Sequence, residues 1–137
     1  MATRDLVNDI DLEVLHLGTN FGTSGTASGH MDLKGYESCT LIFFTATAAN
    51  TATLAVTVQD SDETGSGWAD VADEFLIGSE SDLGYAAAHG TNNDNRLQKI
   101  GYKGPKRYVR LRGVAGVTAT PGYVFAIRGH PHLRPTD

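Results

Sequence analysis

Apolar and polar residues alternate most clearly in the stretch LAVTVQDSDETGSGWADV, which begins at Leu54 and contains the only tryptophan. Leu54, Val56 and Val58 occupy every second position with small or polar residues between them, which predicts a half-buried strand. The residues that follow are of types that favour turns, and Trp68 comes directly after them. The pattern predicts a β-hairpin with Trp68 packed as a core anchor. A sugar-stacking platform is the alternative role for this side chain.

The other strands are predicted from shorter apolar runs between glycine-rich or polar segments. The run 38–47, SCTLIFFTAT, is apolar on both faces and predicts a central strand that packed layers cover on both sides. In the run 107–114, Val109 and Leu111 face one way, and the tyrosine and arginine side chains face the other. Residues 18–29 are expected to form a loop. Further strands are expected at 12–17, 97–102 and 122–129, and a short strand or a turn at 30–35. One helical turn is expected within 71–77, and a long connection at 78–95.

Seven or eight short strands without a long amphipathic helix predict an all-β protein. The expected fold is a jelly-roll-like β-sandwich of about eight antiparallel strands with long loops. A chain of 137 residues is large enough to form one hydrophobic core. We therefore expect a single domain, with an extended N-terminal arm at 1–11, the sandwich at 12–129 and a C-terminal tail at 130–137.

Charge and cysteine content narrow the class of partner. The formal net charge of −5 opposes general nucleic-acid binding, and the cations at 103–112 are expected to pair with carboxylates instead. The single cysteine, Cys39, lies in an apolar run and is expected to be a buried, inert thiol. The N-terminus lacks the apolar region of a secretory signal, and no run approaches the ~18 apolar residues of a membrane span. The sequence predicts a soluble protein that binds neither membranes nor nucleic acid.

Residue patterns of catalytic and metal sites are not found in the sequence. His130 and His132 flank a proline, a spacing that is not diagnostic of a metal site. The acidic run of Asp60, Asp62 and Glu63 lacks the glycine and terminal glutamate of a helical calcium loop. No nucleophile elbow, HExxH motif or phosphate-binding glycine loop occurs. We therefore expect no catalytic residues, no metal and no cofactor, and a protein that is not an enzyme.

Several segments together resemble the small β-rich proteins encoded among the head genes of tailed bacteriophages, the capsid decoration or cement proteins. The most specific are the turn that ends in WADV, the strand KRYVR and the ending GHP. The first two also resemble discoidin-type carbohydrate-binding jelly rolls. The full set is RDLVNDI (4–10), MDLKGYES (31–38), VQDSDETGSGWADV (58–71), IGYKGPKRYVRLR (100–112) and RGHPHLRP (128–135).

The resemblance implies a structural virion protein, made in the host cytoplasm, that binds the outside of the assembled head and bridges capsomers. Its implied partners are the major capsid protein and itself, as a homotrimer. A carbohydrate-binding module, or a virion appendage such as a spike base or tail accessory that contacts the host surface, is the alternative. The residues expected to contact the capsid or a neighbouring subunit are Arg4, Asp5, Leu6, Ile10, Arg110, Arg112, His130, Pro131 and His132.

Overall fold

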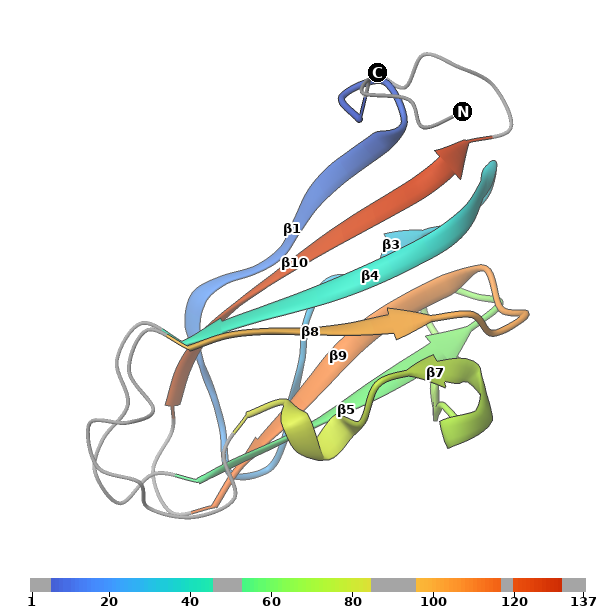
Figure 1. Cartoon of the computed structure of the whole chain (residues 1–137). Coiled ribbons are helices and arrows are strands. Elements are labelled where there is room, and N and C mark those ends of the chain that lie inside the picture. The colour runs from blue at the N-terminus through green and yellow to red at the C-terminus, as the bar shows by residue number, and fades with distance from the viewer. Residues whose placement is uncertain (1–5, 46–52, 85–95, 117–119, 132–137) are drawn as a thin grey trace.

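The computed structural model describes residues 6–45, 53–84, 96–116 and 120–131. These residues form two antiparallel β-sheets that face each other, which confirms the expected all-β sandwich. Sheet A contains, in spatial order, β1 (Ile10–Phe21), β10 (Thr120–Pro131), β4 (Tyr36–Thr45), β8 (Arg96–Tyr102) and β7 (Leu76–Ile77). Sheet B contains β2 (Thr26–Ala27), β9 (Tyr108–Ala115), β5 (Leu54–Ser61) and β6 (Ala69–Asp70), and β3 (Met31–Asp32) also pairs with β9. Figure 1 shows the long strands β1, β10, β4 and β8 side by side in one layer.

The core lies between the sheets and takes alternate residues from each long strand. Leu41 and Phe43 of β4 belong to one cluster of buried side chains with Val56 and Val58 of β5. A polar contact also ties the sheets together. Arg128 on β10 donates hydrogen bonds to the Asp11 carboxylate on β1 and to the Asp32 carbonyl on β3. The sandwich is therefore closed by apolar packing inside and by an arginine at one end.

The predicted hairpin is present, since β5 pairs with β6 and its apolar residues are buried. The predicted helical turn is a 3-10 turn, η1 (Asp73–Phe75), and a second such turn, η2 (Glu80–Asp82), lies at the start of the long connection. The rest of that connection, 85–95, falls outside the described residues. Val109 and Leu111 point into the core, as expected.

The segment 18–29 is not one loop, contrary to the expectation. Its first four residues belong to β1, and Thr26–Ala27 form β2. Phe21 is fully buried and draws this part of the chain onto the core. Strand pairing also extends past the expected boundaries of the arm and the tail, to Ile10 and Pro131.

Two further expectations differ from the structure. Trp68 is not a core anchor, because it lies half-buried on the outer side of sheet B, against Arg110. The strand β4 is central in sheet A, but only one of its faces is covered by the described residues. The second face of this strand is therefore part of the molecular surface.

Candidate functional site

The outer surface of sheet A is apolar across four neighbouring strands, and we call it the apolar face. Strand register places its side chains in three rungs that run across β1, β10, β4 and β8. Within the described part of these rungs, Lys99 is the one charged side chain that points outward. The rungs are Leu17, Tyr123, Phe44 and Leu97; Val14, Phe125, Ile42 and Lys99; and Leu12, Ile127, Thr40 and Gly101, beside which Ile77 of β7 lies.

The side chains at the two flanks of the apolar face, on β1 and β8, are more exposed than those at its centre, on β10. Leu12 and Val14 on β1 are 65% and 53% exposed, and Leu97 on β8 is 71% exposed. Phe125 and Ile127 between them are half-buried. These residues line a groove of about 440 Å³, together with Ile42 and Glu13. The surface is a shallow apolar trough between two apolar ridges.

Strand β10 explains why the outside of this sheet is so apolar. Its large side chains, Tyr123, Phe125 and Ile127, point outward, whereas its smaller residues point into the core. The interior beside β10 is already filled, because a Cβ atom added at Gly122 would lie 2.7 Å from Phe21 and 2.9 Å from Phe43. The core therefore accepts only small residues from this strand, and the larger ones face outward.

The predicted contact residues near the chain ends that the structure describes lie together at one end of sheet A. Leu6, Ile10 and His130 line a second groove, of about 370 Å³, which also includes Ile127 of the apolar face. His130 adopts a φ of 52° and its Nδ1 lies 2.9 Å from the Ser38 hydroxyl. Pro131 pairs with Tyr36 at the same end of sheet A. Arg4, Asp5 and His132 lie outside the described residues.

The other two predicted contact residues, Arg110 and Arg112, lie on the opposite side of the molecule. Arg110 donates two hydrogen bonds to Gln59 Oε1, of 3.0 and 2.8 Å, and its guanidinium carbon lies 4.0 Å from the centre of the Trp68 ring. Burial lowers the Arg110 pKa. Arg112 donates to the Ser24 carbonyl at 3.2 Å. Both cations are thus held by groups of the same chain, and the structure does not bring them to the chain ends.

Trp68 belongs to an aromatic cluster over sheet B. The His30 ring lies 5.9 Å from Trp68 and 5.3 Å from Tyr108, edge-on to the latter. The Trp68 indole N–H donates to the Thr64 carbonyl at 3.2 Å, so the acidic turn holds the ring in place. One feature of the sequence indicates this surface position: the two residues after Trp68 are small or polar, Ala69 and Asp70. In the structure they form β6, and both are exposed.

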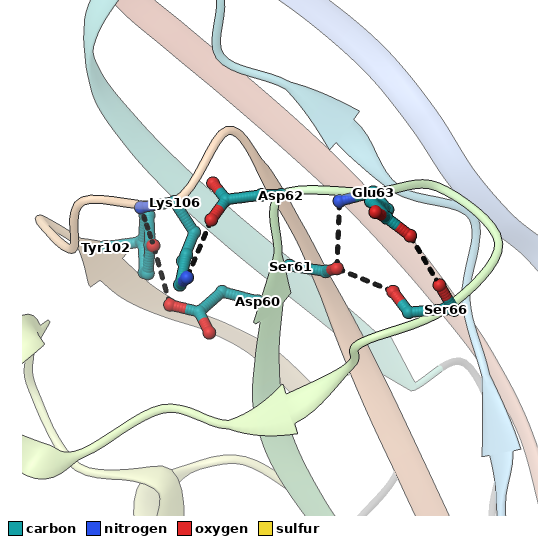
Figure 2. A network of polar contacts seen from close by, with 7 residues as sticks. All are labelled: Asp60, Ser61, Asp62, Glu63, Ser66, Tyr102 and Lys106. Atoms are coloured by element: carbon teal, nitrogen blue, oxygen red, sulfur yellow. Dashed lines mark hydrogen bonds and ion pairs between the residues drawn. The ribbon is translucent and has the colours of Figure 1, made fainter.

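Figure 2 shows the polar network at the acidic turn, where the hydrogen-bonding groups satisfy one another. The Tyr102 hydroxyl donates to Asp60 at 2.8 Å, and Lys106 Nζ lies 2.6 Å from Asp62. Burial is the main cause that raises the pKa of the Tyr102 hydroxyl, and its hydrogen bond to Asp60 raises this pKa further. A hollow of about 420 Å³ lies beside this network, and two of the four cations that line it, Lys106 and Arg107, are paired with carboxylates. The arrangement stabilises the turn and offers no activated nucleophile.

Metal-binding clusters and reactive thiols are not found within the described ranges. These ranges contain no group of three or more histidine, cysteine or carboxylate side chains that could hold a metal ion. Cys39 is buried, and burial raises its thiol pKa to about 12, so the thiolate is not available near neutral pH. No helix among these residues is long and apolar enough to span a membrane.

No protein-family model matches this chain, and no curated protein matches it. Its function is therefore inferred from the surfaces described above and from the resemblance of the five sequence segments.

Proposed function

We propose that this protein is a non-catalytic structural component of a virion, which decorates a phage capsid and stabilises it by bridging capsomers on the outside of the assembled head. The observation that carries the proposal is the apolar face. A folded sandwich that presents three apolar rungs on one sheet is suited to be part of an assembly, because such a surface is costly to leave in water. The resemblance to capsid decoration proteins supplies the identity of that assembly.

The proposed partners are the major capsid protein and further copies of the chain, as a trimer on the virion surface. The end of sheet A where Leu6, Ile10 and His130 meet is the proposed contact with the shell. Both described chain ends leave the sandwich there, since Ile10 pairs with Gly129. One partner surface can therefore contact both described chain ends at this end of sheet A.

The test is co-sedimentation of the purified protein with empty heads that lack it. We expect the protein to sediment with the heads and to saturate at a fixed number of copies per head. Leu6→Asp should weaken this binding, because Leu6 is 62% exposed in the proposed contact. Ala55→Asp, an exposed position on sheet B, is the matched control and should bind as the wild type does. Absence of the wild-type protein from the head pellet would refute the proposal. Binding to tails alone would favour the appendage alternative.

Carbohydrate binding is the second candidate, and the placement of Trp68 favours keeping it. The ring is half-buried rather than buried, and His30 and Tyr108 lie beside it, a composition typical of sugar-binding surfaces. Arg110 already covers one face of the ring at 4.0 Å, so a sugar would stack on the other. Host-surface polysaccharide should then change the Trp68 fluorescence saturably, and a flat titration would exclude this mode.

A further inference from the structure

We infer that the hollow of about 420 Å³ beside the polar network binds carboxylate side chains of an acidic protein segment, and we call it the cationic hollow. It lies between two turns that connect the sheets, 33–35 after β3 and 103–107 after β8. The inference deepens the proposed function, since it assigns the chemistry of the partner surface. It rests on that function only in taking the segment from the shell.

The charge of the cationic hollow is opposite to that of the whole chain. Four cations and two carboxylates line it, an excess of two positive charges, whereas the chain has a net charge of −5. Lys106 and Arg107 are already paired with carboxylates of the same chain. The ammonium groups of Lys34 and Lys103 have no hydrogen bond or ion pair to any described residue. These two lysines are therefore the groups that can bind an anion.

The turn that carries Lys34 is bonded to the turn on the other side of the hollow. The Leu33 N–H donates to the Arg107 carbonyl at 2.8 Å. The Arg107 guanidinium donates to both carboxylate oxygens of Asp32, at 2.9 and 2.8 Å. One of these oxygens also accepts from the Lys34 N–H at 3.0 Å. The backbone at Lys34 is thus held in a fixed position relative to the second turn.

Tyr102 holds the turn that carries Lys103. Its hydroxyl accepts from the Lys106 N–H at 3.1 Å, and Figure 2 shows both residues in this turn. A Cβ atom added at Gly104 would lie 2.5 Å from the same hydroxyl oxygen, so the turn packs directly against the ring. Both lysines therefore extend from backbone that is already in place, and an anion has to order only their side chains.

The cationic hollow lies next to the proposed contact with the shell. Ser38, near the start of β4, lines both this hollow and the groove of Leu6, Ile10 and His130. A partner segment with an apolar residue in that groove can place its next residues in the cationic hollow. Charge complementarity then gives specificity to a contact whose other part is apolar.

Carboxylates fit this hollow better than a nucleic-acid backbone does. Glu37 and Asp62 line the same hollow and would repel a polymer with a negative charge on every unit. The net charge of −5 opposes such a polymer at longer range as well. An acidic peptide carries its charges on flexible side chains, which can reach the two lysines and avoid the carboxylates. We therefore take an acidic protein segment as the occupant, and phosphate and nucleic acid enter the test as alternatives.

The first experiment titrates the purified protein with hexaglutamate and follows its backbone amides by NMR. We expect saturable shifts of the Gly35 and Gly104 signals, because these residues lie in the two turns. The shifts should disappear in about 1 M salt, where charges are screened within about 3 Å. Hexalysine should not produce them. Absence of these shifts with hexaglutamate would overturn the inference, and so would tighter binding of inorganic phosphate or of a single-stranded oligonucleotide.

Charge reversal of one lysine at a time tests the location of the site. Lys34→Glu and Lys103→Glu should each lower the affinity for hexaglutamate at least about fivefold, because an exposed ion pair is lost and a repulsion is added. Lys99→Glu is the matched control: it makes the same charge change at an exposed position of β8 outside the hollow, and should bind almost as the wild type does. Circular dichroism establishes that the variants are folded. Equal losses in Lys103→Glu and Lys99→Glu would overturn the inference, because the attraction would then belong to the whole chain.

Head binding distinguishes this inference from the proposed function. If both hold, Lys103→Glu weakens co-sedimentation with heads. A wild-type protein that binds heads but not hexaglutamate would refute the inference and leave the proposed function standing. A protein that binds hexaglutamate in the cationic hollow but does not bind heads would refute the proposed function and leave the site standing.

Discussion

Substitution of Gly122 by alanine tests why β10 points its large side chains outward. Gly122 is buried on the inner side of sheet A. An added Cβ would lie 2.7 Å from Phe21 Cε2, 2.9 Å from Phe43 Cε2 and 3.1 Å from Phe43 Cζ. Two of these distances are shorter than real Cβ contacts, and both rings are fully buried, so neither can move into solvent.

The expected cost follows from overpacking. Forcing one extra carbon into a filled core costs about 1–3 kcal/mol, because rings or strands must shift. Alanine otherwise stabilises a strand relative to glycine by restricting the unfolded chain, an effect of about 0.4–1 kcal/mol. The clash outweighs this gain, and we expect Gly122→Ala to lower the free energy of unfolding by about 1–2 kcal/mol.

Urea denaturation followed by circular dichroism measures this change as a shift of the midpoint at constant slope. Gly65→Ala is the matched control, since a Cβ added there has nothing within 4 Å of it and the φ of Gly65 is not positive. It should leave the midpoint unchanged or raise it slightly. Phe43→Leu should make room, so the double variant should lose less than the sum of the single losses. A Gly122→Ala midpoint equal to that of the wild type would refute the reasoning that a filled interior forces the large residues outward.

Three further predictions concern the polar end and the aromatic cluster. Tyr102→Phe removes the hydroxyl that donates to Asp60 and accepts from the Lys106 backbone N–H, and should cost about 1–2 kcal/mol in urea denaturation. Asp32 has its pKa lowered from 3.8 to about 2, chiefly by hydrogen bonds from Arg107, so its stabilising contribution is complete above pH 4 and is lost as the pH falls towards 2; Arg107→Ala should flatten this part of a stability profile. Trp68→Ala should cost about 1 kcal/mol, chiefly the contact with Arg110, and a loss of about 3–5 kcal/mol would show that the ring acts as a core residue after all.

Local alternation was enough to predict the long strands and the hairpin, because each depends on residues close in sequence. The orientation of β10 was not predictable in this way, since both of its faces are apolar. Phe125 and Val124 are equally suited to a core, and the choice was made by Phe21 and Phe43, which come from distant parts of the chain. The position of Trp68 likewise depends on a residue distant in sequence, Arg110 on β9, whose guanidinium lies over the Trp68 ring.

The candidate site was also predictable only in part, because the sequence indicates individual residues but not which of them lie together in the fold. Leu6, Ile10 and His130 were predicted as contact residues and are adjacent in the structure, although the sequence alone could not place them on one groove. The apolar face was missed because its members are single alternate positions in four strands. Leu12 and Leu97 come together only through the order β1, β10, β4, β8, in which no neighbours are consecutive in the chain.

If the proposed trimer forms through the apolar face, the stability of the fold depends on its assembly. Partners that bind only the folded state raise the apparent stability by mass action, so the thermal midpoint should rise with protein concentration. Leu97→Lys should remove this dependence while leaving the midpoint of the dilute protein almost unchanged, because the side chain is 71% exposed in the single chain. Thermal melts of both proteins over a wide concentration range provide the measurement. A wild-type midpoint independent of concentration would mean that the apolar face contributes nothing to stability through self-association, and that the large side chains of β10 face water simply because the core has no room for them.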